Sequence, residues 1–146
     1  MKLSLRHIGI VVYDLEAVLK FWTEVMEFTI INKLEESGKG IDLMLGLEKV
    51  NLTTVKLRAH DGNIIELLKF NSHSDISRWS GQPCSTGITH IALTVENLDE
   101  MYQNLNNKTL RFFNKPQLSK DGKVKVIYAE GPEGILLELV ENLYDL

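Results

Sequence analysis

Two histidines occupy matching places in a sequence that repeats itself. His7 and His90 each stand near the start of a short apolar run, 83 positions apart (90 − 7). Each is followed two positions later by a very small residue, Gly9 or Ala92, which leaves space beside the imidazole. Because alternate side chains of a strand lie on one face, each histidine shares its face with that small residue. An imidazole with room beside it is suited to bind a ligand or a metal ion.

Each half of the chain also ends on a glutamate inside an apolar run. Glu66 lies in the run Gly62–Leu68, and Glu138 lies in the matching run Gly134–Val140. A carboxylate that shares a face with aliphatic side chains is costly unless it is paired or bound to a metal. Two such carboxylates and two such histidines would compensate one another if one cation lay between them. We therefore predict a metal site that both halves share.

The elements around these residues predict an α+β fold of two βαβββ modules. In the first module Asp14 can cap a helix, whose apolar stripe assigns Trp22 and Met26 to the core. The run 41–47 is either a short helix or an irregular loop. The other expected elements are strands at 3–12, 28–34, 50–59 and 63–70, a helix at 15–26, a polar break at 35–40 and a tight turn at 60–62.

The second module repeats this plan after a linker at 71–87. Asn97 can cap its helix, with Glu100 in the reciprocal capping position. The expected elements are strands at 88–95, 110–114, 123–129 and 135–141, a helical stripe at 98–105 and a turn at 130–134. The chain is then one domain, 1–146, with module 1 at about 3–70 and module 2 at about 88–141. The His-to-Glu interval is 59 residues in module 1 and 48 in module 2, and we expect the 11 extra residues at 35–50, as a substrate-covering loop.

Composition bounds the function. The chain has 146 residues, 44% of them hydrophobic and 25% charged, as in an ordinary globular protein. A net charge of −4 argues against a nucleic-acid partner, and no apolar run is long enough to span a membrane. The N-terminus leads at once into the first strand, which leaves no room for a signal peptide. A single cysteine, Cys84, favours a reducing compartment, so we expect a cytoplasmic protein.

The chain resembles the vicinal oxygen chelate superfamily, which includes glyoxalase I, bleomycin-resistance proteins and extradiol dioxygenases. The resemblance runs from His7-Ile-Gly-Ile to Gly-Pro-Glu-Gly-Ile-Leu-Leu-Glu138 and covers nearly the whole chain. It implies two βαβββ modules around a cleft with a divalent metal, whose ligands here would be His7, Glu66, His90 and Glu138. This ligand order resembles glyoxalase I, whereas extradiol dioxygenases and fosfomycin-resistance enzymes use three ligands. Such a shell suits Ni, Zn, Co or Mn.

The resemblance implies a lyase or isomerase that transfers a proton next to a metal-bound carbonyl of a small carbonyl or thioester substrate. A ligand glutamate would serve as the base, and we favour Glu138 over Glu66. Glu35 and Glu36 are alternative bases if their segment folds over the site. Val11 and Phe70 stand where glyoxalase I has an arginine and an asparagine that help to bind glutathione. The site therefore suits a more apolar substrate, or one that is held elsewhere.

Two other functions stay open. A methylmalonyl-CoA epimerase would use similar ligands, although Gly131-Pro132-Glu133 replaces the His-Pro-Lys segment usual in those enzymes. The third possibility is a small-molecule-binding resistance protein without catalysis. The family resemblance also implies a homodimer. The residues that we assign to packing or linker roles are Tyr128, Trp79 and Cys84. Cations that could meet a CoA phosphate are Arg111, Lys115, Lys120, Lys123 and Lys125.

Overall fold

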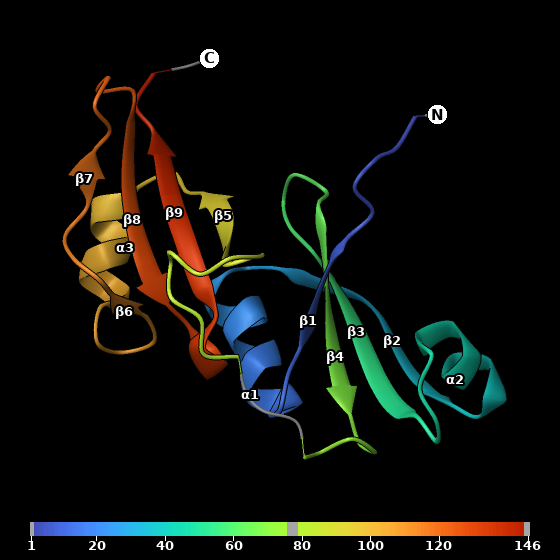
Figure 1. The fold of residues 1–146 in the computed structure, drawn as a ribbon. Helices are drawn as coiled ribbons and strands as arrows, with labels where there is room; N and C mark the ends of the chain where they lie inside the picture. The colour runs from blue at the N-terminus through green and yellow to red at the C-terminus, as the bar shows by residue number, and fades with distance from the viewer. Residues whose placement is uncertain (1, 76–78, 145–146) are drawn as a thin grey trace. The chain divides into compact units, whose positions relative to one another are not determined.

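The chain folds into two units of the same plan, Met1–Ser77 and Arg78–Leu146 (Figure 1). The computed structural model describes residues 2–75 and 79–144. Unit 1 contains β1 (Ile8–Val11), α1 (Leu15–Lys20), β2 (Thr29–Ser37), α2 (Lys39–Leu45), β3 (Asn51–Arg58) and β4 (Ile64–Phe70). Unit 2 contains β5 (His90–Thr94), α3 (Leu98–Leu105), β6 (Arg111–Phe112), β7 (Gln117–Leu118), β8 (Val124–Glu130) and β9 (Leu136–Asn142).

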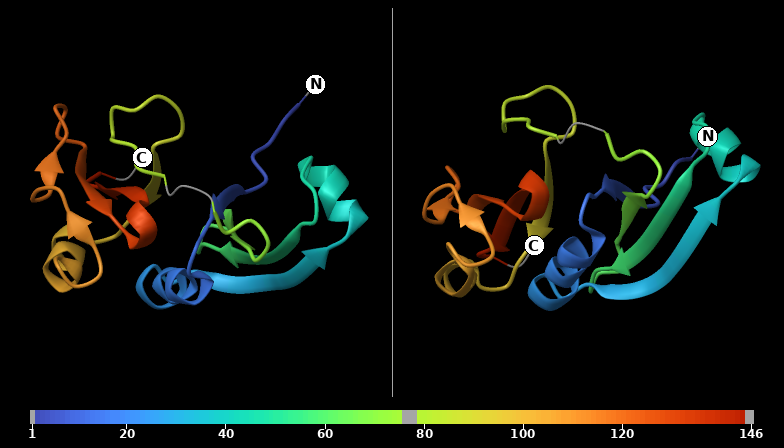
Figure 2. Two further views of the ribbon diagram at one scale, coloured as in Figure 1. Left: turned by 60° about the horizontal axis from the view of Figure 1, so that its bottom comes forward. Right: turned by 90° about the horizontal axis from the view of Figure 1, so that it is seen from below.

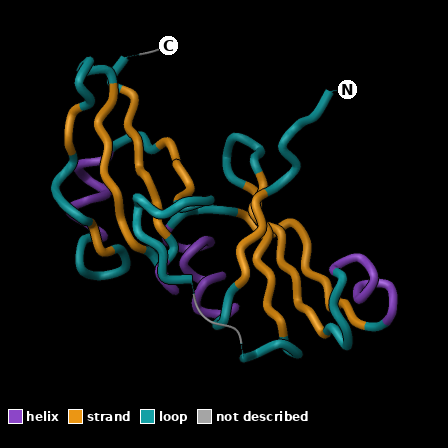
Figure 3. The backbone as a smooth tube through the Cα atoms, viewed as in Figure 1, coloured by secondary structure: helices purple, strands orange, loops and turns teal. Residues whose placement is uncertain are grey.

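Both sheets bring the first strand of the module beside the last one. The strand order is β1-β4-β3-β2 in unit 1 and β5-β9-β8-β6 in unit 2, where β7 also pairs with β8. The pairs β1–β4 and β5–β9 are parallel, and the other pairs are antiparallel. Figure 3 shows the strands of each unit in orange. The predicted α+β fold of two βαβββ modules is confirmed.

One face of the unit 1 sheet carries the core. Alternation places Val55, Leu57, Ile65 and Leu67 on that face, and each of them is at most 4% exposed. Helix α1 packs against β4, and Figure 2 shows it on one side of the sheet. Because side chains alternate, the residue between Ile65 and Leu67, which is Glu66, lies on the opposite, open face.

Trp22 is the largest side chain of this core, as its helical spacing predicts. It is fully buried, and its ring contacts those of Phe21 and Phe28 at centroid distances of 5.5 and 4.9 Å. Trp22 lies in a π-helical turn, Phe21–Val25, that extends α1. The predicted helix at 15–26 is therefore present, with a wider second half. Asp14 caps α1 by accepting a hydrogen bond from the amide of Ala17.

Unit 2 repeats the two-faced sheet. Leu137 and Leu139 on β9 are fully buried, together with Ala129 on β8 and Leu98 at the start of α3. Asn97 caps α3 and accepts a hydrogen bond from the amide of Glu100, as expected. The open face of this sheet carries the residue between the two leucines, Glu138.

Several predicted boundaries in the first half are wrong. β1 begins at Ile8 rather than at residue 3, because its partner β4 begins only at Ile64. Leu3 and Leu5 are accordingly 88% and 78% exposed. β2 continues through Ser37 into the expected polar break, because these residues pair with β3.

The stretch 41–47, which could have been a helix or a loop, forms most of α2. Ile41 packs with Val50 and Leu52, and with the partly buried Leu68 and Phe70. Leu52, Leu68 and Phe70 lie on the open face of the sheet, since they are an even number of residues from Lys56 or Glu66. Helix α2, which lies beyond the end of β2 in Figure 1, therefore covers one end of that face. It lies within 35–50, where we expected the 11 extra residues of the first module.

In the second half, the hairpin regions differ in detail from the prediction. The strand expected at 110–114 pairs over only two residues, Arg111 and Phe112, and a further two-residue strand, β7, was not predicted. The turn at 130–134 includes a short 3-10 turn at Pro132–Gly134. The linker expected at 71–87 includes residues 76–78, which lie outside the described residues. No helix in the described part of the chain is long and apolar enough to cross a membrane.

Candidate metal-binding residues

Unit 1 brings two of the predicted ligands together on its open face. His7 lies directly before β1, and Glu66 lies on β4 in the register row of Gly9. Nε2 of His7 is 3.2 Å from Oε2 of Glu66. The other carboxylate oxygen, Oε1, is 3.4 Å from Nζ of Lys56 on the neighbouring strand β3. Both oxygens of this largely buried carboxylate thus have a partner.

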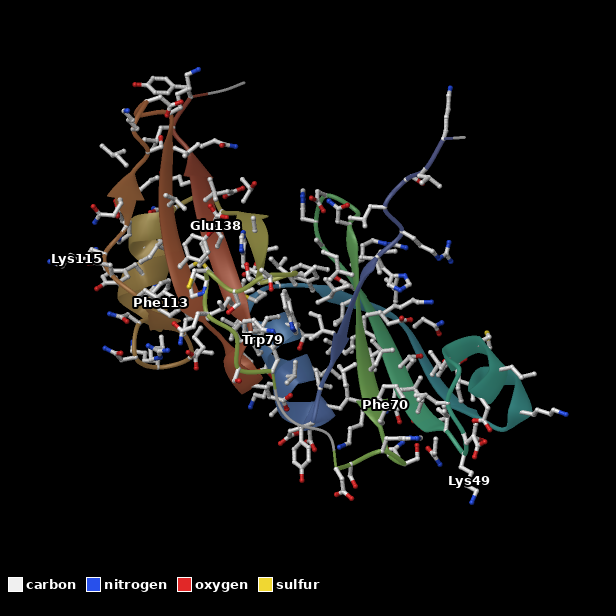
Figure 4. All side chains as sticks on the ribbon, in the orientation of Figure 1. Lys49, Phe70, Trp79, Phe113, Lys115 and Glu138 are labelled. Atoms are coloured by element: carbon white, nitrogen blue, oxygen red, sulfur yellow. The ribbon has the colours of Figure 1, made fainter. Side chains whose placement is uncertain are left out.

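Unit 2 pairs the other two predicted ligands in the same way. His90 begins β5, and Glu138 lies on β9 beside Ala92 (Figure 4). Nε2 of His90 is 3.1 Å from Oε2 of Glu138. Oγ1 of Thr89 lies 2.9 Å from Nδ1 of the imidazole. When Nδ1 donates this hydrogen bond, Nε2 carries the lone pair that a metal ligand needs.

Tyr128 belongs to this pair, although we predicted only packing or linker roles for it. Its hydroxyl donates a hydrogen bond to Oε2 of Glu138 at 3.0 Å and lies 3.4 Å from Nε2 of His90. Burial and the hydrogen bond to Glu138 raise the pKa of the Tyr128 hydroxyl, so it stays protonated and acts as a donor near neutral pH. The hairpin register, which sets Tyr128 opposite Glu138, is the sequence signal that would have found it.

The separations within both pairs fit two adjacent ligands of one metal ion. Ligand atoms about 2.1 Å from an ion, at right angles to each other, are about 3.0 Å apart. The distances of 3.2 and 3.1 Å between Nε2 and Oε2 are close to this value. Neutral imidazole nitrogen and carboxylate oxygen are also the donors that Ni, Zn, Co and Mn accept in proteins.

Each unit by itself offers only such a pair. Among the described residues, no group of three or more His, Cys, Asp or Glu side chains could hold a metal ion. Protein metal sites of this kind use three or four protein ligands. Neither pair alone therefore makes up the four-ligand site predicted from the sequence.

The alternative bases lie in β2, not in a loop. Glu35 accepts a hydrogen bond from the buried Thr53 at 2.7 Å, and Thr53 is on the opposite face from Glu66. Glu36 shares the face of Glu66, but it lies four residues beyond Asn32, which is in the row of Lys56 and Glu66. Four residues of strand span about 13 Å, which separates Glu36 from the predicted ligand.

The residues considered for substrate binding, for a CoA phosphate or for packing lie in different surroundings. Phe70 packs beneath α2, and Val11 is about half exposed on the open face. Two of the five cations considered for a CoA phosphate are in ion pairs, Arg111 with Glu130 and Lys125 with Asp99 and Glu141. Asp99 raises the pKa of Lys125 through its hydrogen bond, and burial opposes this rise. Trp79 is half exposed, with its ring against Gly81, and Cys84 is exposed.

Comparison with solved structures supports the fold. A glyoxalase family protein from Bacillus cereus superposes with a TM-score of 0.88 at 24% identity, over 99% of this chain and 97% of the other. Glyoxalase I from Leishmania major gives 0.66 at 19% identity, over 96% and 87% of the two chains. Glyoxalase I from Zea mays gives 0.66 at 19% identity, over 94% of this chain and 46% of the maize chain.

A comparison with curated protein sequences gave no match. The sequence does match the family model described as Glyoxalase/Bleomycin resistance protein/Dioxygenase superfamily over residues 4–139, which include all four predicted ligands. The duplicated βαβββ plan and the His–Glu pair in each unit agree with that match. The chain belongs to the glyoxalase/bleomycin resistance protein/dioxygenase superfamily.

Proposed function

We propose that the protein is a divalent-metal-dependent lyase or isomerase of the glyoxalase I-like type. The observation that carries this proposal is the duplicated pair, His7 with Glu66 and His90 with Glu138, each joined through Nε2 and Oε2. The four side chains together would hold one ion of Ni, Zn, Co or Mn. Such an ion supplies Lewis-acid polarisation of a carbonyl oxygen.

The residues of the chain supply the proton transfer. Glu138 is the base: among the described residues, its Oε1 has no hydrogen-bond or ion-pair partner, whereas Oε2 contacts His90 and Tyr128. Oε1 can therefore take a proton from the carbon next to the carbonyl. In an isomerisation it would return the proton to the neighbouring carbon, and in an epimerisation to the opposite side of the same carbon. In Glu66 the corresponding oxygen is held by Lys56, which makes Glu66 the weaker candidate.

The open face of unit 1 supports an apolar substrate moiety. Val11 and Leu68 lie in the register row next to Glu66, and the row ends at Leu34 on β2. Val11 is 51% exposed, so apolar surface is available beside the glutamate, while Leu34, which is 45% exposed, lies beyond Thr54 at the outer end of the row. Helix α2 closes the far end of this face and would cover the apolar end of a bound molecule. These features favour a small carbonyl compound or thioester over glutathione itself.

The epimerase and resistance-protein alternatives have less support. The ion pairs of Arg111 and Lys125 leave fewer free cations for a CoA phosphate. A protein that only binds drugs would have no use for a pair of half-buried carboxylates facing imidazoles. We therefore rank the metal-dependent enzyme first.

Metal content tests the proposal directly. After chelation and reloading with Ni, Zn, Co or Mn, we expect about one ion per chain, measured by elemental analysis. His7→Ala and His90→Ala should each lose the ion, because each removes one of four ligands. His60→Ala is the matched control, since His60 lies in the turn between β3 and β4, and it should bind as the wild type does.

Two results would contradict the proposal: a wild-type protein that binds none of these metals, or a His90→Ala variant with unchanged affinity. With the best metal bound, hemithioacetal isomerisation and acyl-CoA epimerisation then separate the glyoxalase-like activity from the epimerase-like one.

We also propose a homodimer, on the family resemblance. Static light scattering should give twice the chain mass of 16.6 kDa in the metal-loaded protein. A monomer that binds the metal with full affinity would refute the dimer, while the proposal of a metal site would stand.

A further inference from the structure

The residue beside each predicted glutamate ligand differs between the two units. Lys56 stands opposite Glu66 in the register of β3 and β4, and Tyr128 stands opposite Glu138 in that of β8 and β9. The two positions are equivalent, because both members of the second pair are 72 residues further along (128 − 56 and 138 − 66). The duplicated site thus has a cation in one half and a neutral hydroxyl in the other.

The positive charge of unit 1 extends along β3. Arg58 is exposed and lies two residues beyond Lys56, on the same open face. Its equivalent in unit 2 is Glu130 (58 + 72), which is neutralised by Arg111. The open face of unit 1 therefore carries two cationic side chains, Lys56 and Arg58, where unit 2 has Tyr128 and Glu130.

The carboxylate of Glu66 balances the charge of Lys56 as long as no second cation binds to that carboxylate. The Lys56 ammonium has no other ion pair among the described residues, and the two side chains are 28% and 14% exposed. In the proposed metal site, the carboxylates of Glu66 and Glu138 would together balance the charge of one divalent ion. The charge of Lys56 is then left over, on a half-buried face where an uncompensated charge is costly. A bound anion would restore neutrality.

We propose that Lys56 is a specificity-determining residue that binds a carboxylate of the substrate. The inference rests on the proposed function and narrows its substrate to carbonyl compounds that also carry a carboxylate close to the carbonyl group. Nζ of Lys56 is 3.4 Å from Oε1 of Glu66, so a carboxylate bound at this ammonium would lie beside the predicted ligand. Asn32, next in the same row, adds an amide donor.

Binding of two matched probes tests the role of Lys56. The probes are 2-oxobutanoate, which is an anion, and its neutral methyl ester, titrated by calorimetry into the metal-loaded protein. We expect Lys56→Met to weaken binding of the anion about tenfold, since a charge-assisted hydrogen bond is lost. Binding of the ester should change less than about twofold, and Lys56→Arg should keep the affinity for the anion.

Lys33→Met is the matched control. Lys33 lies on β2 one residue from Asn32, so its side chain is on the opposite face, and its removal changes the net charge equally. It should leave both affinities unchanged. Equal weakening of both probes in Lys56→Met, or no weakening of either, would overturn the inference.

Metal content, measured first on every variant, separates the two proposals. If the wild type binds no metal, the proposed function fails and this inference fails with it. If Lys56→Met alone loses the metal, Lys56 serves to position Glu66, and the carboxylate-binding role is wrong. If metal binding is intact and only the discrimination between the probes is absent, the inference fails while the proposed function stands.

Discussion

Glu138→Gln is expected to lower kcat about a thousandfold while the protein keeps its metal. Glutamine retains a carbonyl oxygen that can serve as a ligand, but it cannot accept the substrate proton, and a positioned base contributes about 10²- to 10⁴-fold. The measurement is the exchange of the α-proton with D2O, followed by NMR, on whichever substrate the metal-loaded wild type turns over. Metal should be saturating, so that a weaker affinity does not enter the rate.

Glu66→Gln is the matched control for this prediction. Oε1 of Glu66 is held by Lys56, whereas Oε1 of Glu138 has no partner among the described residues, so Glu66 should matter mainly for metal affinity. A larger loss of kcat in Glu66→Gln than in Glu138→Gln, at full metal occupancy, would reverse the assignment of the base.

Trp22→Ala is expected to lower the free energy of unfolding by about 3–5 kcal/mol. The side chain is fully buried between Phe21 and Phe28, and alanine would leave a cavity that these rings cannot fill without moving. Urea unfolding followed by far-UV circular dichroism measures the change.

Trp22→Phe should cost less, about 1.5 kcal/mol, because it retains an aromatic ring in the same place. The indole Nε1 of Trp22 has no hydrogen-bond partner among the described residues, so phenylalanine loses no hydrogen bond. If Trp22→Phe were as destabilising as Trp22→Ala, Nε1 would have to make an interaction that this packing does not contain.

The topology was predictable from the sequence because the chain repeats. Matching histidine and glutamate positions fix the first and last strand of each module, and parallel pairing of those strands brings each His–Glu pair together. The core residue Trp22 followed from helical spacing alone. The hairpin turn at His60-Asp61-Gly62 also followed from residue type, and it sets the register of β3 and β4.

Strand ends were less predictable, because they depend on the partner strand and not on residue type. Leu3 and Leu5 look like strand residues, but β4 begins too late to pair with them. Glu35 and Glu36 look like loop residues, yet the threonines Thr53 and Thr54 across the ladder accommodate them by hydrogen bonds.

The neighbours of the ligands were missed for a related reason. Lys56 and Tyr128 are ten residues from Glu66 and Glu138, and they become neighbours only through the hairpin register. Counting outward from each predicted turn would have placed both of them beside the ligands.

The parallel pairing of β1 with β4 also affects the local stability of unit 1. β1 is an edge strand of four residues, and edge segments with few pairing partners are the first to open in local unfolding. His7 lies directly before β1 and Glu66 lies on β4, so the two strands bring together residues that are 59 positions apart (66 − 7). An ion that binds both would tie the start of the module to its end, so that opening of β1 and release of the ion would become one event.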